Sequence, residues 1–269
     1  MASPSFEIML GRARHPLVLA LDVGSTASRG AIYDANGSPV RPRAKVPHAF
    51  TTRADGTSII DPDQIVREVT QLIDQLVDLT VGHPVAAVSL DTFASSLVGV
   101  DAQGAAVTPC FNYNDNRCAD EVALLRAEVD EDRIQALTGC RFHASYLPAR
   151  LRWLARTEPA TVATVTRWMS LGEYVWLRLL GDTAAGTSVA AWGGLLNRHT
   201  GQWAPAMLEL AGITEDQLNR IADPADGLSP QKGSKARKLW PSLKQAHWCA
   251  PSVTVMRPPV ASATRPAAR

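Results

Sequence analysis

"LALDVGSTASRG", residues 19–30, joins the end of an apolar run to an aspartate and a turn of small residues. The run over residues 16–23 is too short for most helices and stops at Gly24, which predicts a buried strand. Small residues after a buried strand let the backbone turn tightly, so that consecutive N–H groups point into one concavity and bind an anion. The stretch therefore predicts a phosphate site, with a plain hairpin turn as the alternative.

The aspartate in this stretch points to a metal ion. A carboxylate repels a bare phosphate, but the arrangement becomes favourable when a divalent cation lies between the two groups. Arg29, on the far side of the turn, has the charge and the fork geometry to bind phosphoryl oxygens. We therefore expect Asp22 to hold Mg²⁺, and Gly24, Ser25, Thr26 and Arg29 to contact phosphate.

The composition indicates an ordinary globular protein. A chain of 269 residues, 46% hydrophobic and 20% charged, is long enough to bury one large core or two smaller ones. Its four cysteines form no Cys-x-x-Cys pair, which disfavours zinc or disulfide frameworks and favours a reducing cytoplasm. Asp22 interrupts the N-terminal apolar run well before the ~20 residues that a membrane span needs. We therefore expect neither a signal peptide nor a membrane partner.

The charge distribution changes near the C-terminus. From Gly227 to Arg269 the chain has eight Lys or Arg residues and no acidic residue. The last residues also offer few large apolar side chains to offset their ordering entropy, so we expect a basic, disordered tail over residues 229–269. No aromatic residues are interleaved with a basic stripe, so we expect no nucleic-acid partner, and Trp192 is expected to serve packing.

The order of elements predicts an α/β fold. Residues 29–48 read as two further strands with a turn at 34–38, and Pro42 indicates that the second is an edge strand. Residues 61–79 have an N-cap aspartate, Gln64 at a capping-box position and helical apolar spacing. Residues 84–91 form another apolar strand, and residues 96–109 read as the hairpin after it. From residue 118 the pattern is mostly short helices, including one over 214–222. Such an order predicts a mixed sheet flanked by helices.

Five segments, in order, resemble motifs of the FGGY carbohydrate kinases. "LALDVGSTASRGAIYDANG" (19–37) resembles the family's first phosphate motif, and "VSLDTFASSLVGVDAQG" (88–104) its strand and sugar-contacting loop. "NYNDNR" (112–117) is similar to its Trp-x-Asp-x-Arg segment, with tyrosine in place of tryptophan. The segments 137–154 and 168–203 resemble its Thr-Gly and Lys-Leu-x-Trp-Leu region and the end of its first domain. Five ordered motifs are more specific than any one of them.

The resemblance implies a fold, a reaction and cofactors. The fold is that of the actin and hexokinase-like (ribonuclease H-like) ATPases. The reaction is transfer of the γ-phosphate of ATP, with Mg²⁺, to a hydroxyl of a small-molecule carbohydrate, that is, a sugar, sugar acid or polyol. It assigns metal positioning to Asp22 and phosphate contacts to the turn that follows. It assigns substrate contacts to Thr92, Phe93, Ser95, Ser96, Tyr113, Asp115 and Arg117, with the small Ala94 leaving the sugar undetermined. A structural salt bridge is the alternative for Asp115 and Arg117.

The likeness also implies a domain layout and a deficiency. We expect an extension over residues 1–16, the kinase N-terminal domain over 17–228, and the tail over 229–269 in place of a second domain. In the family the catalytic aspartate lies at the start of that second domain, and this chain has no acidic residue after Asp226. We therefore assign no catalytic residue and expect impaired turnover, an exposed apolar docking face and self-association. The alternative is a non-catalytic sugar- or nucleotide-binding module.

Overall fold

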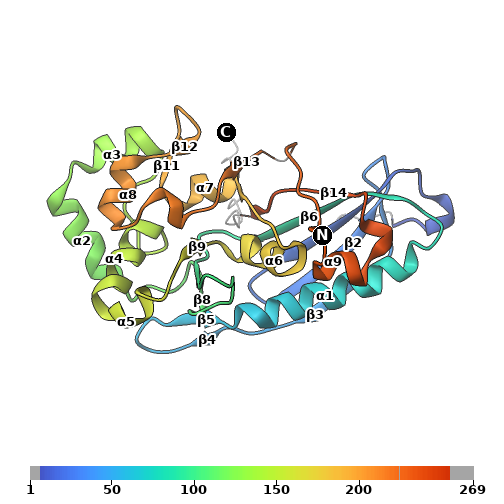
Figure 1. Cartoon of the computed structure of the whole chain (residues 1–269), viewed down its shortest axis with the longest axis horizontal. Helices are drawn as coiled ribbons and strands as arrows, with labels where there is room; N and C mark the ends of the chain where they lie inside the picture. The colour runs from blue at the N-terminus through green and yellow to red at the C-terminus, as the bar shows by residue number, and fades with distance from the viewer. Residues whose placement is uncertain (1–6, 224, 255–269) are drawn as a thin grey trace, which may run out of the picture.

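The mixed sheet predicted from the sequence is present. The computed structural model describes residues 7–223 and 225–254. Strands β1 (Leu17–Val23), β2 (Ala27–Tyr33) and β3 (Pro39–Pro47) form an antiparallel meander, and β6 (Val85–Phe93) runs parallel to β1. The order is β14-β6-β1-β2-β3, so the strand that contains Pro42 lies at an edge, as predicted. Figure 1 shows this sheet at one end of the molecule and a group of helices at the other.

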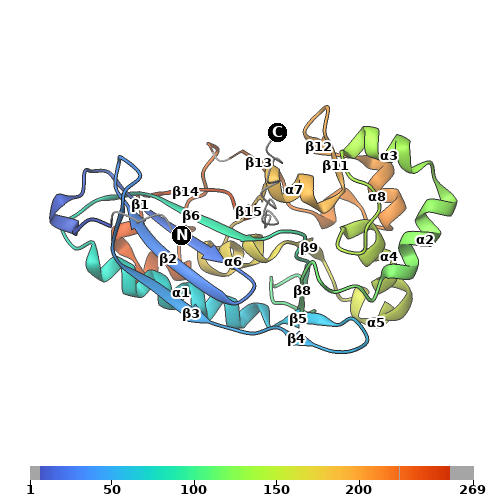
Figure 2. The ribbon, with the colours of Figure 1, turned by 180° about the vertical axis from the view of Figure 1, so that it is seen from behind.

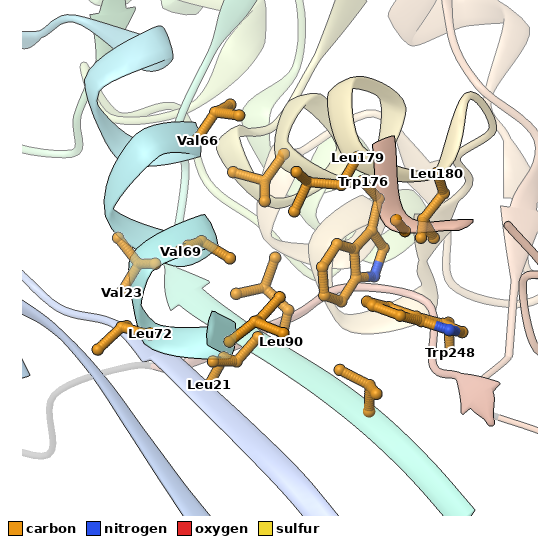
Figure 3. Packing of buried hydrophobic residues seen from close by; sticks show 14 of the residues in the cluster. Leu21, Val23, Val66, Val69, Leu72, Leu90, Trp176, Leu179, Leu180 and Trp248 are labelled. Atoms are coloured by element: carbon orange, nitrogen blue, oxygen red, sulfur yellow. The ribbon is translucent and has the colours of Figure 1, made fainter. Parts of the chain in front are cut away.

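Helices α1 (Pro62–Leu79) and α6 (Leu171–Leu180) bury their apolar faces against the sheet region. Helix α1 begins where the sequence predicts, because the Asp61 carboxylate accepts a hydrogen bond from the Asp63 N–H. The expected capping role of Gln64 is not seen, since its amide binds Glu68 one turn along the helix. Figure 3 shows side chains of α1, β1, β6 and α6 packed into one core together with Trp248.

A second hydrophobic core lies among the shorter helices. Figure 2 shows these helices grouped at one end of the molecule. These are α2 (Ala119–Glu128), α3 (Glu131–Thr138), α4 (Leu147–Thr157), α5 (Pro159–Val162), α7 (Thr187–Gly193) and α8 (Pro205–Ala211). The helix predicted over residues 214–222 is wrong. Its Thr214 capping box forms, but only the 3-10 turn η2 (Glu215–Gln217) follows it, and β13 (Ile221–Ala222) then pairs with β10 (Ala185–Gly186). Tertiary contacts hold this stretch extended, since the buried Asn219 side chain donates to Glu173.

Several short sheets lie outside the main sheet. Strands β4 (Thr51–Thr52), β5 (Ser58–Ile60) and β8 (Cys110–Phe111) form one sheet, and β11 (Leu196–Asn197) pairs with β12 (Gln202–Trp203). In the predicted hairpin over residues 96–109, the turn is closed by the bond from Gly104 N to Asp101 O. Its strand β7 (Val98–Val100) pairs mainly with β9 (Arg167–Met169), which brings the two ends of the molecule into contact.

The disorder expected from residue 229 is wrong for residues 229–254. They form α9 (Lys235–Leu239), the turn η3 (Pro241–Leu243), and strands β14 (His247–Trp248) and β15 (Ser252–Thr254), which both pair with β6. Trp248 is fully buried, with its ring 5.1 Å from that of Trp176. The remaining part of the predicted tail, residues 255–269, lies outside the described residues.

The surface of the described residues gives two further observations. None of the helices found there combines the length and apolar character that a bilayer crossing requires. The large exposed apolar side chains are Met9, Leu79, Val81, Leu124, Trp192 and Leu239. Apart from Leu79 and Val81, at the end of α1, they lie on separate elements. Self-association through an apolar face therefore stays a prediction.

Candidate functional site

The turn between β1 and β2 has the form of an anion site. The Gly24 N–H closes it with a 3.1 Å hydrogen bond to the Ala27 carbonyl oxygen. Within residues 7–223 and 225–254, no acceptor is found for the backbone N–H groups of Ser25 and Thr26. Both residues are at least partly exposed, so these two donors are open to a ligand.

Two charged side chains flank the turn. Asp22 and Arg29 are opposite each other in the β1–β2 register, and their Oδ2 and Nη1 atoms are 3.6 Å apart. The two side chains are 49% and 44% exposed, so the pair is weak and both groups are open to a ligand. A Cβ on Gly24 would lie 3.0 Å from Arg29 Nη1, so a side chain there would require the guanidinium to shift slightly.

The donor set at Asp22 fits hydrated Mg²⁺ shared with a phosphate. Mg²⁺ keeps several waters and is bound through one or two carboxylates together with substrate phosphates. A cluster of three or more His, Cys, Asp or Glu side chains is not found among the described residues. Asp22 has Asp91 of β6 directly beside it in the parallel register, and Asp91 accepts a 2.8 Å bond from Ser252 Oγ. Burial raises the pKa of Asp91, and the nearby charge of Asp22 raises it further.

A cavity of about 540 Å³ opens beside the turn. It is lined by Asp22, Val23, Gly24, Ser25, Thr26, Arg29, Phe93, Ala94, Ser95, Tyr113, Ser145, Tyr146 and Trp192. All the predicted phosphate contacts line it, and so do Phe93, Ser95 and Tyr113 from the predicted substrate contacts. The fold therefore brings segments from residue 22 to residue 192 to one hollow.

The other four predicted substrate residues lie elsewhere. Thr92 is fully buried, and its hydroxyl has no partner among the described residues. Ser96 Oγ accepts a hydrogen bond from the Leu171 N–H at the start of α6. Neither side chain is among those that line the cavity, so the structure gives them no direct access to a substrate there.

Asp115 and Arg117 form an ion pair away from the cavity. The Asp115 carboxylate is buried and accepts bonds from Arg117 at 2.8 Å and from the Ser58 backbone N–H at 3.0 Å. The Arg117 guanidinium lies over the ring of Trp153, 4.7 Å from its centroid. These contacts favour the salt-bridge alternative over sugar binding, because both charged groups already have partners.

Sequence reasoning missed the aromatic wall of the cavity. Tyr146 and Trp192 have ring centroids 6.3 Å apart, and Trp192, expected to serve packing, is 36% exposed at the cavity. Ser145 lies beside them on the same wall. All three lie inside the quoted motifs 137–154 and 168–203, but nothing in those patterns separates a wall residue from a packed one. The wall forms because the fold brings the residues directly before α4 next to Trp192 of α7.

The buried Arg150 of α4 holds the loops around the cavity. Its guanidinium donates to the backbone carbonyl oxygens of Ser95, Asn112, Asp115 and Ala144 at 2.9–3.3 Å. Each of these carbonyls is in or next to a segment that lines the cavity. Burial lowers the pKa of Arg150 from its ordinary value. One side chain therefore fixes three loops relative to one another.

The loop after β6 is held in an uncommon conformation. Ser95 has φ of 56°, in the left-handed region that non-glycine residues rarely adopt. Its hydroxyl donates to the Trp192 carbonyl oxygen at 3.2 Å, and its own carbonyl accepts from Arg150. These contacts hold Ser95 against the cavity wall.

Arg150→Lys is expected to lower the free energy of unfolding by about 1–2 kcal/mol. An ammonium on a flexible stem reaches fewer of the carbonyls than the planar guanidinium does, and three of the acceptor residues, Ser95, Asn112 and Asp115, are buried. Urea denaturation measures the loss. The matched control is Arg67→Lys on exposed α1 surface, expected to change stability by less than about 0.5 kcal/mol. Equal effects of the two substitutions would contradict the role given to Arg150.

The comparisons with known proteins place this chain among sugar kinases. The profile of the FGGY family of carbohydrate kinases, N-terminal domain, matches residues 17–232. The gluconokinase of Bacillus subtilis is 23% identical over 207 residues, covering 76% of this chain and 40% of its own length. The autoinducer-2 kinase of Klebsiella pneumoniae is 28% identical over 218 residues, covering 77% and 40% respectively. The chain thus spans about two fifths of the length of these curated relatives.

Solved structures agree in fold. The gluconate kinase of Lactobacillus acidophilus superposes with a TM-score of 0.81 at 25% identity, covering 88% of this chain and 48% of its own. The glycerol kinase of Plasmodium falciparum, solved with ADP, gives 0.78 at 15% identity, covering 88% and 48%. The fold is therefore that of the actin and hexokinase-like ATPases, as the sequence motifs imply.

Proposed function

Because the chain belongs to the FGGY family of carbohydrate kinases, we propose that it forms the part of an ATP-dependent kinase site that binds phosphate and carbohydrate. The observation that carries this proposal is the turn after β1. It offers two open backbone N–H groups, the Arg29 guanidinium and the Asp22 carboxylate on one cavity wall. A triphosphate with Mg²⁺ matches that combination of donors and one acid.

The residues of the turn have separate roles in this proposal. The Ser25 and Thr26 N–H groups and Arg29 bind phosphoryl oxygens, and Asp22 holds the metal. When bound, Mg²⁺ neutralises phosphate charge and so makes a carboxylate tolerable beside the anion. The fixed positions of these donors favour phosphate binding, because little reorganisation is needed when the ligand arrives.

The cavity wall supports a carbohydrate substrate. Phe93, Tyr113, Tyr146 and Trp192 supply apolar faces, and the Ser145 hydroxyl supplies a polar contact. Such a mixture of aromatic faces and a few polar groups is typical of small-molecule sites. We propose a sugar, sugar acid or polyol as the substrate class.

One observation favours a second function, a binding module without turnover. In the described part of the chain, Asp22 is the only acidic side chain among the residues that line the cavity. A second carboxylate that could act as general base for the attacking hydroxyl is therefore not found among the residues that line the cavity. In that case the chain binds nucleotide or carbohydrate but does not transfer phosphate.

Asp22→Asn is expected to weaken binding of MgATP about 10–100-fold, the range typical when a group that supports a metal is lost. The amide keeps the shape of the side chain but lacks the charge that Mg²⁺ requires. Isothermal titration of the 269-residue chain with ATP, with and without Mg²⁺, measures the effect. Asp78→Asn, at an exposed position of α1, is the control and should bind as the wild type does. Unchanged affinity in Asp22→Asn would remove Asp22 from the site.

A further inference from the structure

His48 reaches the phosphate turn from a buried position after β3. Its side chain has no exposed surface, and its Nε2 is 2.9 Å from the Gly24 carbonyl oxygen. The backbone N–H of the same residue donates to the Thr26 carbonyl oxygen at 3.1 Å. His48 is not among the residues that line the cavity. One residue therefore contacts two carbonyls of the turn without facing the ligand.

The contact with Gly24 determines where a neighbouring donor points. In a trans peptide, the C=O of one residue and the N–H of the next lie in one plane and point in opposite directions. The Gly24 carbonyl is directed at His48, so the Ser25 N–H is directed away from it. Ser25 lines the cavity, and its N–H is one of the two open donors there. Loss of the His48 contact would free this peptide to rotate.

A buried network holds the imidazole ring in place. Glu68 Oε2 is 2.8 Å from His48 Nδ1 and accepts a 2.7 Å bond from Ser28 Oγ. The other carboxylate oxygen accepts from the Gln64 amide at 2.9 Å. A carbonyl oxygen only accepts, so the Nε2 that faces Gly24 carries a hydrogen. Glu68 has two donors besides His48, Ser28 and Gln64, so the carboxylate keeps hydrogen-bond partners when the ring is replaced.

We propose that His48 is a positioning residue of the phosphate site, held by Glu68, and that it orients the Ser25 N–H toward the bound phosphate. This inference rests on the proposed function for its consequence in nucleotide binding. Its structural part, the orientation of the Gly24–Ser25 peptide, can be measured with no ligand present. An experiment can therefore contradict the peptide orientation without contradicting the proposed function, and the reverse.

Two substitutions at residue 48 separate the two ring contacts. The amide nitrogen of Gln lies about as far along the side chain as Nε2, so His48→Gln keeps a donor for Gly24. The amide nitrogen of Asn corresponds to Nδ1, so His48→Asn keeps a donor for Glu68 and loses the contact with Gly24. Both variants lose the ring, which makes them matched controls for packing.

The reporter is hydrogen exchange of the Gly24 N–H, which is protected by its bond to Ala27. This N–H belongs to the preceding peptide, and its exchange measures the loosening of the turn that rotation of the Gly24–Ser25 peptide would cause. We expect about tenfold faster exchange in His48→Asn, the factor that one ordinary hydrogen bond contributes, and less than about threefold in His48→Gln. MgATP affinity should fall about tenfold in His48→Asn and stay within about threefold in His48→Gln. Exchange of the Tyr174 N–H in α6 should be unchanged in both.

Several results would overturn the proposal. Equal Gly24 exchange in the two variants would show that His48 only fills space. The expected difference in Gly24 exchange between the two variants, together with no MgATP binding by the wild-type chain, would leave the peptide orientation supported and the proposed function wrong. If a variant does not fold, nitrogen-15 spectra of the wild-type chain decide the point. They should show a proton on His48 Nε2, and an unprotonated Nε2 would contradict the contact with Gly24.

Discussion

A polypeptide of these 269 residues is expected to bind MgATP but to release ADP about 10²–10⁴-fold more slowly than a carbohydrate kinase that has both halves of the site. An alcohol is a poor nucleophile at neutral pH, and that factor is what a positioned general base contributes. Asp22 is the one acid on the cavity wall in the described part of the chain, and we assign it to the metal. The sequence has no acidic residue after Asp226.

The measurement is a coupled assay for ADP release over a panel of sugars, sugar acids and polyols. The same panel is run with a two-domain FGGY kinase, and with this chain joined to a second domain of that type. Full turnover by the 269 residues alone would contradict the prediction. Asp91→Asn is the variant to test in that case, because Asp91 lies beside Asp22 in the sheet and binds Ser252.

Trp248→Ala is expected to lower the free energy of unfolding by about 3–5 kcal/mol, as large-to-small changes in a packed core do. The Trp248 side chain is fully buried, lies edge-on to Trp176, and stacks on Trp240 with centroids 6.3 Å apart. Its indole N–H donates to the Leu243 carbonyl oxygen, which also accepts from the Ala246 N–H, so the expected loss comes mainly from the cavity. Urea denaturation followed by circular dichroism measures the change.

The matched control for Trp248 is Trp192→Ala. Trp192 is 36% exposed at the cavity, so its loss should cost clearly less, about 1–2 kcal/mol at most. Wild-type stability in Trp248→Ala would mean that residues 229–254 are only loosely attached to the sheet. The disorder expected from the sequence would then be correct for them after all.

The sequence alone determined the features that depend on residues close together in the chain. The turn after β1 is a hairpin, so Asp22 and Arg29 are brought opposite each other within eight residues. Helix α1 follows from apolar spacing and from a cap at Asp61, which are also local. The mixed sheet followed from the order of such segments, and the family from motifs spread along the chain.

The tertiary structure decided which side chains line one cavity and which already have hydrogen-bond or ion-pair partners within the protein. Asp115 and Arg117 carry the right chemistry for a sugar, but stacking on Trp153 and the bond to Ser58 place them in a structural pair. His48 looks unremarkable in the sequence, and its role depends on Glu68, twenty residues away on another element. A single contact between residues far apart in the chain leaves no repeating pattern in the sequence from which it could be predicted.

Residues 229–254 show the same limit most clearly. The prediction of disorder for them rests on the basic charge after Gly227 and on the shortage of large apolar residues in the final stretch, 253–269. In the fold, β14 and β15 add to the edge of β6, a strand about 160 residues earlier in the chain, and Trp248 enters a core that other elements have already built. The sequence determined the local turns and helices, because contacts between residues close together in the chain stabilise them. Only the tertiary structure decided the order of residues 229–254 and the cavity wall, because contacts with elements far away in the chain stabilise these parts.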